Sequence, residues 1–171
     1  MVNRETQRFY DEGEDFWPKR YAIWGGLIAR QPEQVAYSIV DSRAMGLFMP
    51  SVFPAVKADT IPALADALGL DGEGLSRAVT TYNTSVRPGH FDPGALDDCH
   101  TEGLDPPKSH WAVPIDSPPF YGYPLKTGVT FTYRGVSVDE QARVRFDNGD
   151  SASNVFAAGE VMAGLTAKLL T

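Results

Sequence analysis

Residues that can bind a metal ion are concentrated in one part of the chain. The run Asp97–His100 contains two aspartates, the single cysteine and a histidine, and His90 and His110 flank it. Carboxylate, thiolate and imidazole groups are the ligands that zinc prefers. The run lacks the paired Cys-x-x-Cys or His-x-x-x-His spacing of structural zinc sites. The sequence therefore favours a solvated loop here and predicts no metal site.

A nucleophilic cysteine is the other chemistry that this run could carry. Cys99 would be the nucleophile and His100 its base. Adjacent loop residues seldom hold a thiolate and a base at hydrogen-bonding distance together with a third group that orients the base. The sequence gives little support for catalysis by Cys99.

The composition limits the partners and the compartment. With 171 residues, 43% of them hydrophobic, the chain can form one compact domain, or one domain with an appendage. The net charge is −7 and Lys and Arg form no cluster, so nucleic acid and anionic membranes are disfavoured, whereas small carboxylates remain compatible as ligands. No stretch approaches the about 20 apolar residues that span a bilayer, and the polar start is unlike a signal peptide. We expect a cytoplasmic protein, which the lone Cys99 also fits.

The elements that would position a site alternate between helix and strand in the first part of the chain. Pro18 precedes residues 19–30, whose composition favours a helix, and Val35–Val40 is rich in β-formers. The segment Met45–Val56 contains two prolines and many apolar side chains. This composition predicts an irregular but packed connection.

Two helices with clear start signals follow. Thr60 can cap the first, whose apolar residues recur at helical spacing until Gly69. Asp71 can cap the second, which we expect to end between Ser85 and Pro88. From Pro88 to Pro119, the prolines, glycines and aspartates predict a long loop.

The last third of the chain favours β-structure. Phe120–Leu125, Val129–Val138 and Ala142–Phe146 are typical of strands, and a turn at Asp147–Asp150 leads to a short strand at Val155–Ala158 that should be buried. The pattern predicts an α+β chain, mainly helical up to about residue 125 and β-rich beyond it.

Five stretches of the sequence carry a family resemblance. The C-terminal third reads PPFYGYPLKTGVTFTYRGVSVDEQARVRF and then NVFAAGEVMAG, and RFYDE, VDS and AVKADTIPALADALGLDGEGLSRAVTTYN precede it. In order and spacing these stretches resemble the fumarate reductase and succinate dehydrogenase flavoprotein family. The resemblance implies a helical substrate-capping domain at residues 1–125, incomplete at its start. It also implies that residues 126–171 are an antiparallel β meander of the FAD-binding domain, truncated at its end.

Within the family, DFWPKRYAIWG, LFMPSVFP and TFTYRG are similar to the tricarballylate dehydrogenase branch. This similarity implies an FAD-dependent dehydrogenation of a tri- or dicarboxylic acid, of the tricarballylate to cis-aconitate type. The branch that dehydrogenates 3-ketosteroids is the second one that the resemblance admits.

The resemblance assigns a catalytic role to Arg20. In the family, an arginine of the capping domain lies near the substrate carboxylates, where a proton must move, and Arg20 in RYAIWGGLIARQ matches it. A guanidinium suits this place because it forms bidentate hydrogen bonds with a carboxylate and stays charged. On the sequence alone, a solvated arginine on a helix is the simpler interpretation.

The same resemblance implies the rest of the site. Gly159 and Glu160 match the family's contact to the flavin nucleotide, where the glutamate accepts hydrogen bonds from hydroxyl groups and the glycine allows close approach. The substrate-binding stretch corresponds to Thr130, Phe131, Thr132 and Arg134, with Phe131 where fumarate reductases carry a histidine. Arg134 could supply a positive charge instead, or lie on the surface of a strand. The presence of Phe131 in place of that histidine argues against fumarate as the substrate.

The family holds FAD through a Gly-x-Gly-x-x-Gly turn between a strand and a helix, and this chain has no such turn. Its nearest match, Gly72–Gly74, follows a helix and lacks the third glycine. We therefore expect a cloned fragment or truncated product that is inactive alone and binds little or no FAD, although the intact family uses FAD. The alternative is a non-catalytic interaction module that pairs with itself, as a homodimer, or with a separate flavin-binding chain.

Overall fold

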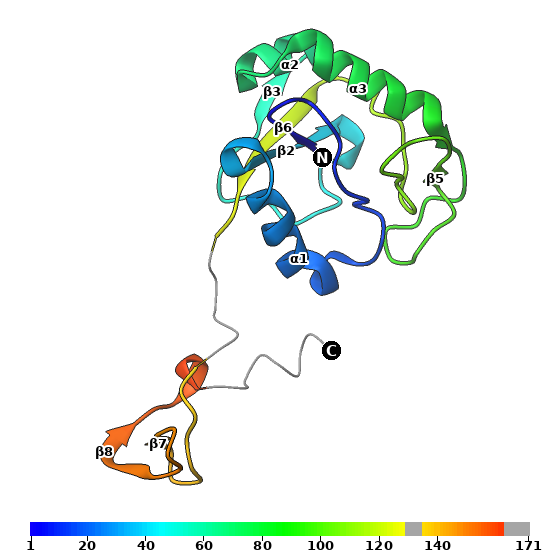
Figure 1. Cartoon of the computed structure of the whole chain (residues 1–171). Coiled ribbons are helices and arrows are strands. Elements are labelled where there is room, and N and C mark those ends of the chain that lie inside the picture. Colours follow the sequence, from blue (N-terminus) through cyan, green and yellow to red (C-terminus); the bar gives the residue numbers. More distant parts are fainter. Residues whose placement is uncertain (129–134, 163–171) are drawn as a thin grey trace. The chain divides into compact units, whose positions relative to one another are not determined.

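The computed structural model describes residues 1–128 and 135–162, which form two compact units divided between Thr127 and Gly128 (Figure 1). Each unit is described by itself. The first contains strands β1 (Val2–Asn3), β2 (Val35–Asp41), β3 (Val56–Ala58), β4 (Val86–Arg87), β5 (His100–Thr101) and β6 (Phe120–Lys126), and helices α1 (Trp17–Ala29), α2 (Ile61–Leu68) and α3 (Gly72–Ser85). The second contains β7 (Arg143–Arg145) and β8 (Ser151–Phe156).

A four-stranded antiparallel sheet, in the order β1-β2-β6-β3, forms the centre of the first unit. The long strands β2 and β6 pair along their whole length, from Val35 opposite Lys126 to Asp41 opposite Phe120. Both strands were predicted, and their existence is confirmed. Helices and strands both occur in this part of the chain, in agreement with the predicted α+β class, and its core is built on the sheet that these strands form.

The core lies where α2 and α3 meet this sheet, and α2 packs against α3, β3 and β6 (Figure 1). Leu64 of α2 and Leu75 of α3 are fully buried. Val35, Tyr37 and Ile39 alternate along β2 and pack into the same cluster, as the two-residue period of a strand requires. Side chains from β1, β2, β6, α2 and α3 thus form one apolar core.

Local chemistry fixes the ends of α2 and α3 as predicted. The Thr60 hydroxyl accepts a hydrogen bond from the Ala63 amide, and Gly69 ends α2 in the left-handed conformation, with φ of +68°. The Asp71 carboxylate accepts hydrogen bonds from the Glu73 and Gly74 amides and starts α3. These caps were readable from sequence because each involves residues at most three positions apart.

The connection at residues 45–55 differs from its prediction. It is irregular, but its apolar side chains are exposed, with Met49 at 79%, Val52 at 92% and Phe53 at 80%. Phe48 makes an edge contact with Tyr123 of β6, at 5.9 Å between ring centroids. Apolar composition predicted packing, but burial needs a partner surface, and the described residues of this unit supply one only in part.

The second unit is built on the β7–β8 hairpin. Near the start of the hairpin, Nη2 of Arg143 lies 2.8 Å from Oδ2 of Asp139. Val138 forms a β-bridge with Val144. The predicted strand at residues 155–158 is not buried, since Val155 is 50% and Phe156 is 62% exposed within this unit. Residues 129–134 of the predicted strand 129–138 lie outside the described residues. In the described ranges, no helix combines the length and the apolar composition that crossing a bilayer requires.

Candidate functional site

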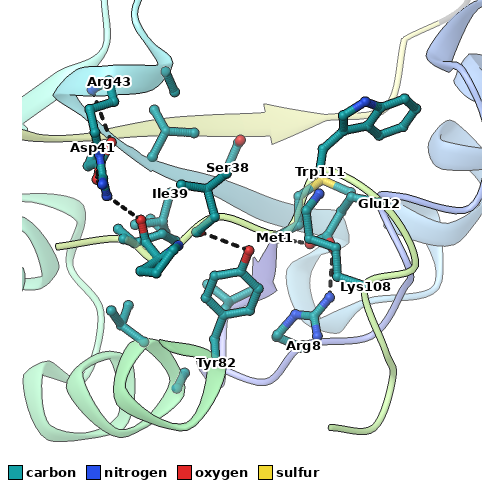
Figure 2. A pocket seen from close by; sticks show the side chains of 18 of the residues that line it. Met1, Arg8, Glu12, Ser38, Ile39, Asp41, Arg43, Tyr82, Lys108 and Trp111 are labelled. Atoms are coloured by element: carbon teal, nitrogen blue, oxygen red, sulfur yellow. Dashed lines mark hydrogen bonds and ion pairs between the residues drawn. The ribbon is translucent and has the colours of Figure 1, made fainter. Parts of the chain in front are cut away.

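A cavity of about 660 Å³ opens inside the first unit. Ile39 of β2 and Leu75 and Val79 of α3 supply apolar walls, and Trp24 and Trp111 also line it. Figure 2 shows charged side chains gathered at two places, Arg8, Glu12 and Lys108 on one side and Asp41 with Arg43 on the other. The cavity thus combines apolar walls with a few charged groups, as small-molecule sites do.

The first charged group is organised around Glu12. Its carboxylate lies 2.7 Å from Nη2 of Arg8 and also contacts the N-terminal ammonium group. Arg8 is held in place because Nη1 donates a 2.6 Å hydrogen bond to the carbonyl oxygen of Pro106. Burial raises the pKa of Glu12, but the N-terminal ammonium, Lys108 and Arg8 more than offset it, and the pKa falls to about 2. Glu12 is therefore charged throughout the physiological range.

Lys108 is the second cation of this group. Burial lowers the pKa of its amine below the ordinary value, because the opposing charge of Glu12 offsets burial only in part and Arg8 adds to the lowering. Among the described residues, no carboxylate oxygen lies within 4.0 Å of its Nζ atom, and Glu12 forms its ion pairs with Arg8 and the N-terminal ammonium. The ammonium group of Lys108 thus lines the cavity without a direct ion-pair partner.

The second charged group joins the end of β2 to the loop before β6. Nη2 of Arg43 lies 2.6 Å from both Asp41 and Asp116. Asp41 also accepts hydrogen bonds from the amides of Asp116 and Ser117, at 3.2 and 3.1 Å. Burial raises the pKa of Asp41, but Arg43 and these amides hold it below its usual range. Both carboxylates and the guanidinium are therefore matched with one another.

Arg20 lies on α1 and is not among the residues that line the cavity. Its Nη2 lies 3.0 Å from the Glu14 carboxylate, its Nε lies 4.0 Å from that of Asp15, and its side chain is 27% exposed. Two carboxylates of the chain thus lie beside this guanidinium. A substrate carboxylate that binds Arg20 would have to displace them. Its catalytic role stays a prediction.

Gly159 and Glu160 lie in the second unit, in a single turn of 3-10 helix at Gly159–Val161. Gly159 has a φ of +74°, and no atom lies within 4 Å of the position that a Cβ would take. Glu160 is exposed. Gly159 thus leaves open space beside a left-handed backbone, and the flavin contact of Gly159 and Glu160 stays a prediction. Thr130, Phe131, Thr132 and Arg134 lie outside the described residues.

Asp97 and Asp98, the aspartates of the run 97–100, accept hydrogen bonds from backbone amides. Asp97 accepts hydrogen bonds from the amides of Cys99 and Trp111, and Asp98 accepts one from the amide of His90. Cys99 is buried, and burial raises the pKa of its thiol, with Asp97 adding to the effect. Within residues 1–128 and 135–162, no group of three or more metal-binding side chains converges.

Sequence reasoning missed the charged group at the cavity. Arg8 and Glu12 are four residues apart, a spacing that could have suggested an ion pair. Lys108 comes from a loop about a hundred positions further along, and Pro106 in the same loop holds Arg8. No local pattern connects these segments.

Comparison with known proteins gives a family and a shared fold. Residues 1–168 match the family described as FAD binding domain. NADH:acrylate oxidoreductase of Vibrio harveyi is 28% identical over 173 residues, which cover 98% of this chain and 16% of that protein. A 3-oxosteroid 1-dehydrogenase of Mycobacterium tuberculosis is 29% identical over 186 residues, which cover 95% of this chain and 33% of that protein.

The structure resembles the open conformation of a flavocytochrome c3 fumarate reductase, with a TM-score of 0.70 at 22% identity. The match covers 96% of this chain and 27% of that one. At this identity, the likeness shows a common fold. The chain spans 16% to 33% of the length of these proteins.

Proposed function

The chain belongs to the FAD binding domain family, and on that ground we propose that it is part of an FAD-dependent oxidoreductase that dehydrogenates a tri- or dicarboxylic acid. The proposed reaction is of the tricarballylate to cis-aconitate type. The family match over residues 1–168 is the observation that carries the proposal. The stretches DFWPKRYAIWG and LFMPSVFP, similar to the tricarballylate dehydrogenase branch, support the substrate class.

The names of the similar proteins support a carboxylate substrate. Acrylate and fumarate are both carboxylates, and they occur in the names of the oxidoreductase from Vibrio harveyi and of the structurally similar reductase. The 3-oxosteroid 1-dehydrogenase, at 29% identity, supports a steroid as the second candidate substrate. A carboxylate stays the first choice because a guanidinium such as that of Arg20 can bind it through two hydrogen bonds.

In this proposal, the first unit supplies the substrate cap and Arg20 binds a substrate carboxylate. Glu14, at 3.0 Å, holds the guanidinium until the substrate carboxylate takes its place. Arg20 also serves where a proton moves on the substrate, while Thr130, Phe131, Thr132 and Arg134 contribute to substrate binding. Gly159 and Glu160 contact the flavin nucleotide, which when bound supplies the hydride acceptor.

We propose that the dinucleotide itself is held by another stretch of polypeptide, so that this chain alone is inactive. The exposed apolar side chains at residues 45–53 and at Val155 and Phe156 favour a missing partner surface. They are equally compatible with the alternative, a non-catalytic module that pairs with itself or with a flavin-binding chain. Activity of a reconstituted complex separates the two.

Flavin titration tests this proposal. We expect the purified chain to bind FAD weakly or not at all, and to bind it near one equivalent once a family FAD-binding half carrying the Gly-x-Gly-x-x-Gly turn is supplied. Absorbance of bound flavin after gel filtration measures both. A chain that purifies yellow at one equivalent overturns the proposed division, and a reconstituted complex that oxidises none of the carboxylic acids offered overturns the proposed activity.

Substitution of Arg20 tests its role in the reconstituted enzyme. We expect Arg20→Ala and Arg20→Lys each to lower kcat/KM for tricarballylate by about a hundredfold or more, because general acid–base and bidentate contacts are lost. Arg30→Ala is the matched control, since Arg30 lies exposed at the end of the same helix. Lysine that restores full activity, or an alanine variant as active as the Arg30 control, would remove Arg20 from the mechanism.

A further inference from the structure

The geometry of the cavity points to a second ligand site, independent of Arg20. We propose that the cavity binds an organic monocarboxylate with an apolar body, whose carboxylate pairs with Lys108. This site is separate from the proposed oxidoreductase site because Arg20 is not among the residues that line the cavity.

The charges around the cavity select one anionic group. Arg8, at 2.7 Å, and the N-terminal ammonium of Met1 share the Glu12 carboxylate, and Arg43 lies 2.6 Å from both Asp41 and Asp116. Lys108 is the lining cation that, among the described residues, has no carboxylate oxygen within 4.0 Å. An ammonium removed from water without an ion-pair partner gains most from an incoming anion. Figure 2 shows it beside Arg8 and Glu12.

The same charges disfavour a second anionic group. Glu12 and Asp41 line the cavity at its two charged places, and each keeps its negative charge because its pKa is lowered. For Glu12, burial raises the pKa but the N-terminal ammonium, Lys108 and Arg8 outweigh it. For Asp41, burial likewise raises it but Arg43 and backbone amides outweigh it. A di- or tricarboxylate would therefore place its further charges among apolar walls and near these aspartate and glutamate groups.

The size and walls of the cavity fit an apolar body. A volume of about 660 Å³ lies within the range of about 300 to 1,000 Å³ that small-molecule sites occupy. Ile39, Leu75 and Val79 offer aliphatic surface, and Trp24 and Trp111 offer aromatic surface. An aromatic or medium-length aliphatic chain can be buried there while its carboxylate stays at Lys108.

Calorimetric titration of the full chain with 3-phenylpropanoate tests the site. We expect saturable binding of one equivalent, and at least about tenfold weaker binding of succinate and tricarballylate, because their added charges are not matched. The neutral analogue 3-phenylpropanol should also bind at least about tenfold more weakly than 3-phenylpropanoate, because a charge-assisted hydrogen bond is lost. Absence of saturable binding, or binding of the polycarboxylates as tight as that of the monocarboxylate, overturns the proposal.

Substitutions of Lys108 test whether the carboxylate of the ligand binds at this residue. We expect Lys108→Met, which keeps the unbranched side chain, to weaken binding of 3-phenylpropanoate at least about tenfold but to leave binding of 3-phenylpropanol unchanged. Lys108→Arg should restore most of the affinity, and Lys57→Met, at an exposed lysine of β3, should have no effect. Retained binding of the alcohol shows that the variant is folded. Equal affinity of Lys108→Met and the unchanged chain for the carboxylate rules out Lys108 as its partner. Because no step uses flavin, failure here leaves the proposed oxidoreductase function untouched.

Discussion

Replacement of Glu12 by Gln is expected to lower the free energy of unfolding by about 3 to 5 kcal/mol. The neutral amide leaves Arg8 and the N-terminal ammonium without the carboxylate that they share, and it removes the longer-range attraction between Glu12 and Lys108. Urea unfolding followed by circular dichroism measures the loss. Glu5→Gln is the matched control, because Glu5 is exposed and surface substitutions change stability by no more than about 0.5 kcal/mol.

The pH dependence gives this prediction a second measurement. The pKa of Glu12 falls from an ordinary value of 4.5 to about 2 in the folded chain. A lowered carboxyl pKa means that Glu12 stabilises the fold fully above pH 4.5 and loses that contribution as the pH falls toward 2. The contribution is on the order of 3 kcal/mol. The difference in stability between the unchanged chain and Glu12→Gln should therefore shrink across this window, and a constant difference would contradict the assignment.

Leu64→Ala is expected to destabilise the first unit by about 2 to 5 kcal/mol, because it removes a buried isobutyl group and leaves a cavity. Leu64 of α2 is 0% exposed and belongs to the buried core cluster. Leu47→Ala makes the same chemical change at a side chain that is 54% exposed. The midpoint of urea unfolding should be clearly lower for Leu64→Ala than for Leu47→Ala. A loss for Leu64→Ala no larger than that of the Leu47 control would mean that this cluster is not the core.

The sequence predicted the parts of the fold that depend on neighbouring residues. Thr60, Gly69 and Asp71 mark the ends of α2 and α3, and they contact amides at most three positions away or use their own backbone conformation. The strands β2 and β6 were also found from their composition. Their pairing was not, because it joins segments about 85 residues apart, and no period within either strand encodes which other strand it will meet.

Burial was predicted least well where apolar residues lack a partner. Met49, Val52 and Phe53 have the composition of packed residues and yet are exposed. Composition reports which side chains would gain from burial, whereas the presence of a surface to bury them against is a property of the whole assembly.

The candidate site shows the same limit. Arg20 was identified through a family resemblance, and the structure adds the neighbouring carboxylates of Glu14 and Asp15, which lie close to it in the sequence. The cavity, in contrast, brings Arg8 and Glu12 together with Lys108 from a distant loop. A cavity of this kind is a product of tertiary structure, so its ligand chemistry could be inferred only from coordinates.

The pairing of β2 with β6 also determines when this chain can fold during its synthesis. β2 is complete once Asp41 has been made, but its long neighbour ends at Lys126, so most of the first unit must leave the ribosome before the central sheet can close. Until then, the apolar face that β2 will share with α2 and α3 has no sheet to complete it. Contacts between such distant segments slow folding. A nascent chain halted before residue 120 should therefore be unable to close the sheet, whereas a chain whose residues up to 126 have all left the ribosome can do so.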